Sequence, residues 1–428
     1  MTAIQLAIKR ISPQQIFMGS AFLVNGGNYL YNLLLGRMLG PKAFADAALL
    51  VTLLLVLSFI GMTFQLATTK FAVLFDAERW TNFKNSMYRY ALVFGLITGG
   101  LILVGANYLQ VLFRTENHWM FVVFAIFMPL YFVMSVNRGR FQGRQEFGKL
   151  ATTYQTEMWS RLLLTFLFLW ILPFQSAILI ALGIGVSFVF GLIPSDLKEV
   201  NILSKSKMDR VDFKQVWVFI GLTAGYELTQ IIINNSDILL VKHYFSATDA
   251  GLYSSLALIG RVVYFVAWMF VMLLMPAVIQ KRKDGEATAP ILFKYLLFIG
   301  LLSSFIVGVC FLMPEFIIQV MFGDAYLSVA GLLWQYALAT SLFALSNIFA
   351  YYFLSLDHYA PVILSGILGF SQVLLIVLFH DSLATVVQVQ ILAMVILLVA
   401  QLIFFFMKNR KMKIKVNANE KINGIDQI

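Results

Sequence analysis

Two rows of polar side chains lie inside apolar stretches of the chain and share one spacing, i, i+3 and i+7. The six residues are Asn25, Asn28 and Asn32 in the first row and Glu227, Gln230 and Asn234 in the second. At 100° per residue, these offsets fall within about 60° of one another, so each row predicts a polar stripe on one face of a helix. Such side chains could hydrogen-bond a polar ligand in a cavity, or they could join neighbouring helices. We favour the lining of a cavity, because three amides in one stripe exceed what packing needs.

Two arginines also lie inside apolar stretches, where a charge costs roughly 2.5 to 3.5 kcal/mol on insertion scales. Arg261 has no acidic residue three or four positions away, so it is our first candidate for binding an anionic ligand, since a guanidinium fork stays charged and matches phosphate oxygens. An ion pair with Glu227 or Asp237 is the alternative. Arg161 follows Glu157 by four residues, a spacing at which the two side chains meet on one helix face. We favour that ion pair over a role for Arg161 in binding cargo.

Three further charged residues lie within or beside these apolar stretches and are candidates for a function. Arg37 lies near the end of the first striped helix, where it could attract phosphate or extend to the membrane interface. Glu227 and Asp237 are candidates for coupling to Na⁺ or H⁺, which would require that they titrate while partly desolvated. We do not favour coupling, because the two carboxylates would couple nothing if they paired with Arg261.

The elements that must position these residues are membrane helices. The chain has 428 residues, of which 60% are hydrophobic and 12% charged, about half the charged share of a soluble domain. A helix needs about 20 apolar residues to span a bilayer. Twelve such stretches occur at approximately 16–38, 43–66, 88–110, 119–137, 153–172, 176–195, 214–235, 250–275, 291–313, 327–354, 360–379 and 383–407. They are too long and too continuously apolar for barrel strands, so the sequence predicts an all-α polytopic membrane protein.

The basic residues give this topology an orientation. Of the 31 Lys and Arg residues, 25 lie at the two ends of the chain or in every second gap between spans. Positive residues stay on the cytoplasmic side, so we expect both termini to be cytoplasmic. The net charge of +10 therefore indicates orientation and contact with anionic membrane lipids, and no nucleic-acid-binding motif accompanies it.

The sequence gives no sign of catalysis or of a bound cofactor. The single cysteine, Cys310, lies inside an apolar span and can form neither an intrachain disulfide nor a thiolate metal site. The sequence has no Walker A motif, no metal-binding histidine cluster and no nucleophile elbow. We therefore expect a protein that is not an enzyme and that holds no metal and no cofactor.

The chain divides into two similar halves. The longest polar connection lies between the sixth and seventh spans. We predict a six-helix bundle at 1–200, a cytoplasmic linker at 201–213, a second six-helix bundle at 214–407 and a basic cytoplasmic tail at 408–428. The polar stripes open the two halves, and segments 33–44 and 238–251 resemble each other after them. Repeated bundles around a central cavity are typical of secondary transporters, which bind substrate near the midplane between the repeats.

Four short motifs add a family resemblance. They are GRMLGP at 36–41, RGRFQGRQEF at 138–147, NSDILL at 235–240 and AGLY at 250–253. In this order, and within twelve spans, they make nearly the whole chain similar to the polysaccharide-unit flippases of the multidrug/oligosaccharidyl-lipid/polysaccharide exporter superfamily, which include O-antigen translocases. The family commonly has Phe-Gly-x-Tyr after its first Leu-Gly-Pro, whereas Phe44-Ala45-Asp46-Ala47 stands here. The family pattern therefore does not explain Asp46. In the second motif, we expect 140–143 to be a short polar turn after the fourth span.

The resemblance implies a mechanism and a cargo. It implies two bundles around an often cationic cavity that opens alternately to the cytoplasm and the periplasm of a bacterial inner membrane. The implied cargo is an oligosaccharide joined by a diphosphate to a polyprenyl lipid, and polysaccharide polymerase machinery is an implied partner. For this cargo, Arg261 is our first candidate ligand of the diphosphate, and Asn25, Asn28 and Asn32 could hydrogen-bond the sugar hydroxyls. The alternative is a multidrug or cation antiporter of the same superfamily. We rank it second, because an anionic cavity would suit cations, whereas the chain has two arginines within spans and no carboxylate in its first stripe.

Overall fold

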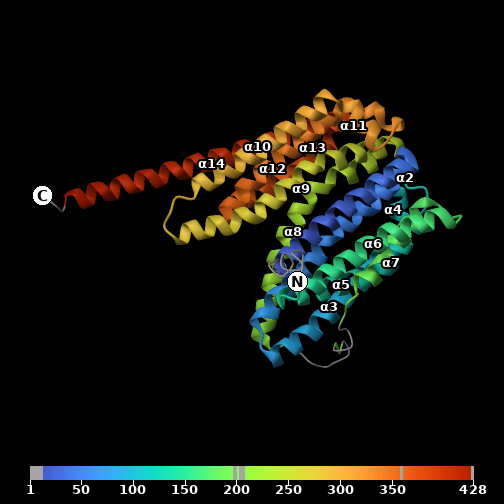
Figure 1. The fold of residues 1–428 in the computed structure, drawn as a ribbon, viewed down its shortest axis with the longest axis horizontal. Helices are drawn as coiled ribbons and strands as arrows, with labels where there is room; N and C mark the ends of the chain where they lie inside the picture. The colour runs from blue at the N-terminus through green and yellow to red at the C-terminus, as the bar shows by residue number, and fades with distance from the viewer. Residues whose placement is uncertain (1–12, 196–199, 202–207, 357–359, 426–428) are drawn as a thin grey trace, which may run out of the picture. The chain divides into compact units, whose positions relative to one another are not determined.

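The regular elements of the computed structural model are helices throughout the residues that it describes, 13–195, 200–201, 208–356 and 360–425 (Figure 1). In chain order they are α2 (Pro13–Leu74), α3 (Ala77–Val104), α4 (Ala106–Phe113), α5 (Trp119–Gly143), α6 (Phe147–Ile171), α7 (Ser176–Gly191), α8 (Arg210–Tyr244), α9 (Ala247–Lys283), α10 (Ala289–Leu312), α11 (Pro314–Met321), the 3₁₀ helix η2 (Asp324–Leu332), α12 (Leu333–Ser355), α13 (Ala360–Leu378) and α14 (Leu383–Ile425). The predicted all-α class is confirmed. Positions 202–207 of the predicted linker and 426–428 of the predicted tail lie outside the described residues.

The predicted membrane spans coincide with these helices. Seven helices among the described residues are long and apolar enough to cross a membrane. The longest, α2, holds two predicted spans, 16–38 and 43–66, because its helical geometry breaks at Gly40, where φ is 70° and ψ is 170°. This positive φ favours glycine, and Pro41 then removes a backbone donor. The break therefore separates two spanning segments of one continuous element.

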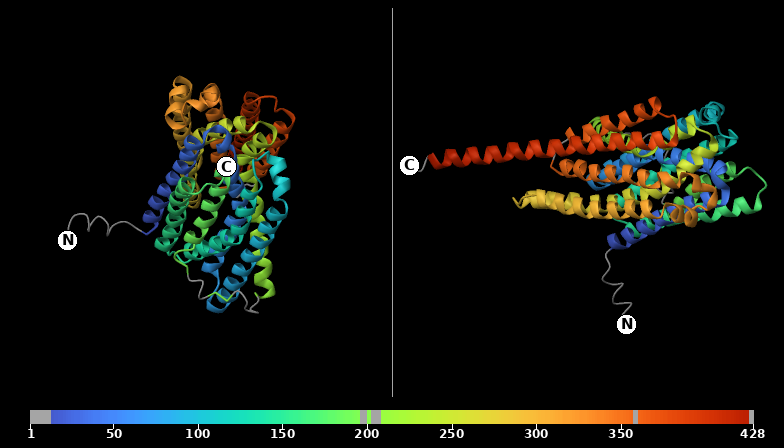
Figure 2. Two further views of the ribbon diagram at one scale, coloured as in Figure 1. Left: turned by 90° about the vertical axis from the view of Figure 1, so that its right-hand side faces the viewer. Right: turned by 90° about the horizontal axis from the view of Figure 1, so that it is seen from above.

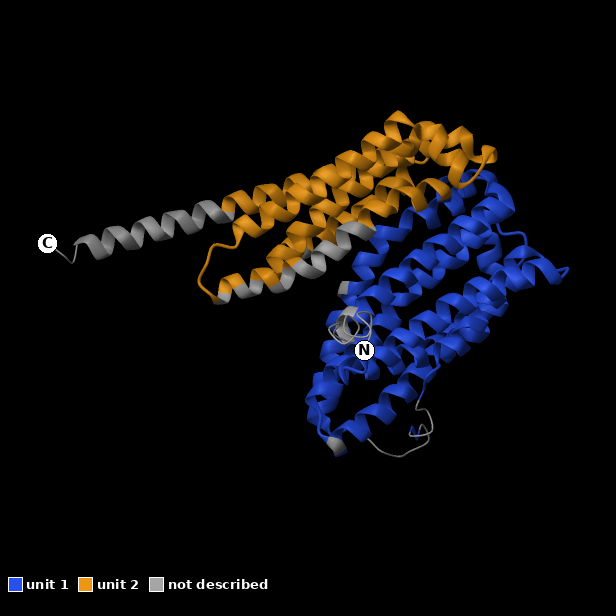
Figure 3. Ribbon diagram, in the orientation of Figure 1, with its two compact units in different colours: residues 1–254 blue, residues 255–428 orange. Residues whose placement is uncertain are grey.

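The chain forms two compact units, residues 1–254 and 255–428 (Figure 3). Helix α8 belongs to the first unit, where it packs against α2. The predicted division into bundles at 1–200 and 214–407 concerns the sequence repeat and stays a prediction.

Unit 1 is built around α2 and α5. Helix α5 packs against α2, α3 and α7, and α6 packs against α2 and α7 (Figures 1 and 2). A phenylalanine-rich core joins α2, α3, α5 and α8; its fully buried members are Phe71, Phe83, Met87, Tyr88, Ala91, Phe132, Val136 and Val216. Lipid tails are as apolar as these side chains, so burial away from lipid gives little hydrophobic driving force. Dispersion contacts between the rings and the release of lipid from between the helices hold the helices together.

The segment 140–143 is not the polar turn that the sequence predicts. It is the last helical turn of α5, and both Arg140 and Phe141 are buried. The glycines of the motif explain why. A Cβ atom on Gly139 would lie 2.3 Å from the carbonyl oxygen of Gln65, and one on Gly143 would lie 2.5 Å from that of Thr69. These glycines therefore let α5 approach the backbone of α2 closely along its final turns.

Unit 2 is organised around α12, which packs against α10, α13 and α14. Phe405 of α14 lies at the centre of an aromatic cluster, with ring centroids 5.7 to 6.3 Å from those of Phe293, Phe349, Tyr352 and Phe353. Such edge-on ring pairs add to the packing energy of the buried area.

Candidate functional site

A buried ion-pair cluster joins α5 to α6 inside unit 1. Glu157 Oε1 lies 2.8 Å from Arg161 Nη2, which confirms the predicted pair one helical turn apart. Glu157 Oε2 lies 2.7 Å from Arg138 Nη2. Arg138 Nη2 also donates to the carbonyl oxygen of Thr153 at 2.9 Å, and the guanidinium lies 3.8 Å from the centre of the Tyr154 ring. The predicted fourth span ends at 137, which places Arg138 in the connection after it. The sequence therefore did not predict Arg138 as the second partner of Glu157.

The cluster carries one surplus positive charge, because a single carboxylate is shared by two guanidinium groups. Arg161 lies 5.9 Å from the centre of the Tyr31 ring on α2, and the Tyr31 hydroxyl is 3.3 Å from Thr165 Oγ1. Helix α7 closes the cluster, since a Cβ on Gly191 would lie 3.1 Å from Glu157 Cβ. Arg161 is therefore packed within unit 1, and its role in binding cargo stays a prediction.

The two polar stripes share their hydrogen-bonding pattern as well as their spacing. Asn32 Nδ2 donates to the carbonyl oxygen of Asn28 at 2.9 Å, and Asn234 Nδ2 donates to that of Gln230 at 2.8 Å. Within the described part of the chain, no donor reaches the buried oxygens Asn28 Oδ1 and Gln230 Oε1. The middle residue of each stripe thus presents a buried amide oxygen with unused capacity to accept a hydrogen bond, at equivalent positions of α2 and α8.

The other predicted site residues of unit 1 differ in exposure. Asn25 and Arg37 are exposed on α2, and Glu227 is half-buried on α8. Asp237 is buried, and its Oδ2 accepts a hydrogen bond of 3.1 Å from the Tyr253 hydroxyl. Tyr253 therefore competes with any cation for this carboxylate.

Arg261 belongs to unit 2, where it is half-buried on α9. Its neighbour Gly260 accepts a hydrogen bond of 2.9 Å from the Thr340 hydroxyl of α12, and Tyr264 stacks on Phe343 with ring centroids 5.4 Å apart. These contacts fix the turn of α9 that carries Arg261 against α12. Its function as a diphosphate ligand stays a prediction.

Asp46, which the sequence left unexplained, forms a buried ion pair. Its Oδ1 lies 2.6 Å from Lys242 Nζ, and the two residues are only 4% and 2% exposed. The backbone N–H of Glu116 donates to Asp46 Oδ2 at 3.3 Å, and the exposed Glu116 side chain pairs with Lys42 at 3.0 Å. The ion pair joins α2 to α8. The sequence held one indication of this ion pair, because both residues fall at span ends on the side predicted to be periplasmic.

The opposite end of unit 1 gathers basic residues from several helices. Arg79 donates two hydrogen bonds to Asp212, from Nε at 2.9 Å and from Nη2 at 2.5 Å. The Arg144 guanidinium lies 5.0 Å from the Trp80 ring, and Lys149 Nζ is 2.7 Å from Glu146. The first two contacts bring together the start of α3, the end of α5 and the start of α8, and the third lies at the start of α6. All of these carry basic segments predicted to be cytoplasmic.

Comparison with known proteins complements this geometry. A family model described as "Polysaccharide biosynthesis protein" matches residues 34–331. No curated protein matches the sequence.

Solved membrane transporters share the fold. An inward-facing multidrug resistance MATE family transporter of the MOP superfamily is 12% identical, with a TM-score of 0.70 over 90% of this chain and 95% of that one. The lipid II flippase MurJ, in an inward closed conformation, is 15% identical, with a TM-score of 0.70 over 91% of this chain and 87% of that one. An outward-facing MATE transporter is 16% identical, with a TM-score of 0.57 over 94% of this chain and 97% of that one. At these identities the likeness shows the fold.

Proposed function

Because this chain belongs to the family of polysaccharide biosynthesis proteins, we propose that it is a flippase for lipid-linked oligosaccharides. Its cargo would be a sugar unit attached through a diphosphate to a polyprenyl lipid. It would move this cargo from the cytoplasmic to the periplasmic leaflet of a bacterial inner membrane. The fold is shared with the lipid II flippase MurJ, which supports a multi-pass transporter, whereas the cargo is our inference from the residues.

The observation that carries this proposal is the pair of unused amide oxygens, Asn28 Oδ1 and Gln230 Oε1. A buried acceptor without a donor costs about 1 to 3 kcal/mol, and an apolar residue at either position would avoid that cost. A sugar presents many hydroxyl donors, so a passing glycan would satisfy both oxygens. The free energy that the two unpaired oxygens cost in the empty protein is then recovered as binding free energy when cargo is present.

The charges of the arginines suit the other part of the cargo. A diphosphate needs positive charge where water is scarce, and a guanidinium keeps its charge and binds phosphate oxygens through two parallel hydrogen bonds. Arg261 is our candidate for this contact, and Arg37 is the candidate at the rim. The surplus positive charge of the cluster around Glu157 adds a field that favours anions over cations.

Transport of this kind changes no covalent bond. Sugar units cannot cross hydrocarbon unaided, so the protein supplies a polar path while the polyprenyl chain stays in lipid. Alternating exposure of one site to the two sides then moves the cargo, and any gradient of Na⁺ or H⁺ would act by favouring one of the two states. Glu227 and Asp237 are the candidates for such coupling. Polysaccharide polymerase machinery is the partner that would receive the cargo outside.

A second candidate function is the export of organic cations. Two observations favour it: the fold likeness to MATE multidrug transporters and the half-buried carboxylate of Glu227 within the second stripe. Cation export would need a negative binding site, and the surplus positive charge in unit 1 opposes one. We therefore rank lipid-linked oligosaccharide transport first.

Deletion of the gene separates these two functions. Loss of a flippase should cause lipid-linked oligosaccharide to accumulate on the cytoplasmic leaflet, with no change in sensitivity to cationic dyes. An unchanged leaflet distribution together with new dye sensitivity would instead identify a drug exporter. Complementation then tests the diphosphate ligand. Arg261→Gln should abolish rescue at normal membrane abundance, Arg261→Lys should restore it in part, and full rescue by the Gln variant would remove Arg261 from the site.

A further inference from the structure

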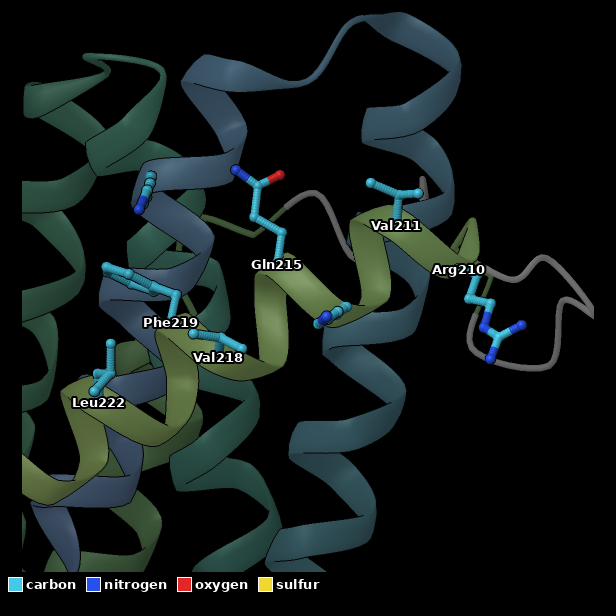
Figure 4. Close-up of a pocket in the computed structure, with 8 residues that line it drawn as sticks. Arg210, Val211, Gln215, Val218, Phe219 and Leu222 are labelled. Atoms are coloured by element: carbon cyan, nitrogen blue, oxygen red, sulfur yellow. The ribbon is translucent and has the colours of Figure 1, made fainter.

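A groove between α2 and the start of α8 has features that transport of the proposed cargo does not explain. It is an open hollow of about 770 Å³, lined by Lys70, Arg210, Val211, Lys214, Gln215, Val218, Phe219 and Leu222 (Figure 4). Seven of these eight residues come from α8, and Lys70 comes from the last turns of α2. All three basic residues of the groove are exposed.

Core packing fixes which face of α8 forms this groove. Val216 is fully buried in the core of unit 1, and Asp212 is buried in its ion pair with Arg79 of α3. At 100° per residue, positions 211, 214, 215, 218 and 222 fall within an arc of about 100°, whose centre lies roughly 150° from Val216. The groove is therefore the face of α8 opposite the core, and the buried acid Asp212 lies away from this face and pairs with Arg79.

The groove changes in character along its length. The cations Arg210 and Lys214 lie in the first two turns of α8, whereas Val218 and Leu222 follow one and two turns later, 55% and 73% exposed. From Val211 to Leu222 the helix rises roughly 16 Å, which is about half the hydrocarbon thickness of a bilayer. Figure 4 shows Gln215, Val218 and Leu222 on successive turns. Positive charge gives way to apolar surface over the depth of one membrane leaflet.

Lys70 is fixed in position at this site. Its Nζ lies 4.1 Å from the centre of the Phe219 ring, and Phe219 in turn packs edge-on against Phe71 with ring centroids 6.0 Å apart. The ring contact stabilises the ammonium group without neutralising it. The groove thus combines Lys70, which contacts the Phe219 ring, with two cations from the start of α8.

We propose that this groove binds an anionic glycerophospholipid. Its phosphate headgroup lies among Lys70, Arg210 and Lys214, and an acyl chain runs along Val218 and Leu222. Charge complementarity and the order of cations followed by apolar side chains along α8 identify this occupant. The groove lies at the end of unit 1 that carries the other basic residues. In our topology this end faces the cytoplasm, where the leaflet is rich in anionic lipids and attracts basic segments.

Lipid retention by the purified full-length protein tests this proposal. Native mass spectrometry after titration with phosphatidylglycerol or phosphatidylcholine gives the affinity for each lipid. We expect phosphatidylglycerol to bind more tightly. The double variant Lys70→Gln/Lys214→Gln should weaken that binding about thirtyfold, as expected from about 1 kcal/mol for each basic residue near an anionic headgroup. The charge-conserving variant Lys70→Arg/Lys214→Arg should keep it, and so should Lys149→Gln, a control at the same end of unit 1 but outside the groove.

Three results would overturn the proposal. Equal affinity of the wild type and the double glutamine variant for phosphatidylglycerol would show that the groove binds no phospholipid. Displacement of phosphatidylglycerol by equimolar polyprenyl phosphate from the wild type, but not from the double glutamine variant, would identify the groove as a cargo site. Inorganic phosphate should not compete at the same concentration, since it lacks the acyl chain that the apolar residues bind; competition by inorganic phosphate would show that only the cations matter.

Discussion

The buried ion pair between Asp46 and Lys242 makes a sharp prediction about stability. The two charges lie 2.6 Å apart and are almost fully buried between α2 and α8. Asp46→Asn would leave the ammonium group buried without a counter-charge, and Lys242→Met would leave the carboxylate in that state. Asparagine keeps an oxygen that can accept the hydrogen bond from the Glu116 N–H, so the first substitution removes little besides charge.

The magnitudes follow from burial. Breaking a buried pair by removing one partner costs about 3 to 5 kcal/mol, whereas replacing both partners by neutral residues is often close to neutral. Each single variant should therefore lose about 3 to 5 kcal/mol of unfolding free energy. The double variant should lose much less than the sum of the two, with a coupling energy of at least about 3 kcal/mol. Lys42→Met is the matched control, because its pair with Glu116 is exposed and should contribute about 1 kcal/mol or less.

The assay is reversible unfolding of the purified protein in mixed detergent micelles with increasing dodecyl sulfate, followed by tryptophan fluorescence and far-ultraviolet circular dichroism. A double-mutant cycle from the wild type, the two single variants and the double variant gives the coupling energy between Asp46 and Lys242 directly. Simple addition of the two single losses would refute the reasoning, because it would mean that the two side chains do not interact across α2 and α8. An equally large loss in the Lys42 control would show that the assay reports general damage at this end of the protein.

Three further predictions test other parts of the structure. Glu157→Gln should lower the unfolding free energy by about 3 to 5 kcal/mol in the same assay, because it leaves two buried guanidinium groups without an anion; a loss below about 1 kcal/mol would mean that water solvates them. Gly139→Ala should destabilise the protein by about 1 to 3 kcal/mol, since its Cβ would lie 2.3 Å from a carbonyl oxygen of α2, whereas Gly100→Ala meets nothing within 4 Å and should be tolerated; equal effects of the two would contradict the close approach. Asn28→Leu and Gln230→Leu should each raise the melting temperature and reduce transport, because each removes a buried oxygen that lacks a donor; lower melting temperatures would show that these oxygens have partners.

Helix positions could be predicted from the sequence because hydrocarbon leaves few choices. Backbone groups in lipid must be satisfied within each segment, so an apolar run of sufficient length is a helix. The stripe spacing and the pairing of Glu157 with Arg161 were equally accessible, because both depend on periodicity within a single helix. The repeated hydrogen bonds of Asn32 and Asn234 show that local spacing carried this information in both halves of the chain.

Contacts between helices were not predictable in the same way. Arg138 lies 19 residues before Glu157, and Asp46 lies almost two hundred residues before Lys242, so no local period relates either pair. Segment 140–143 was misread for a related reason. Arg140 and Gln142 indicate an exposed turn when composition alone is considered, whereas Gly143 and the preceding Gly139 serve close packing against α2 that only the tertiary structure displays.

The most direct test of the proposed function uses the purified protein in liposomes that contain a polyprenyl-diphosphate oligosaccharide. A membrane-impermeant glycosidase or lectin added outside measures how much of the glycan is exposed over time. We expect the protein to make the inner pool accessible, and we expect the Asn28→Leu variant to do so more slowly than the wild type at equal protein density. An inner pool that stays protected in the presence of folded wild-type protein, in liposomes where the same protein moves an organic cation, would contradict the proposal that it carries lipid-linked sugars.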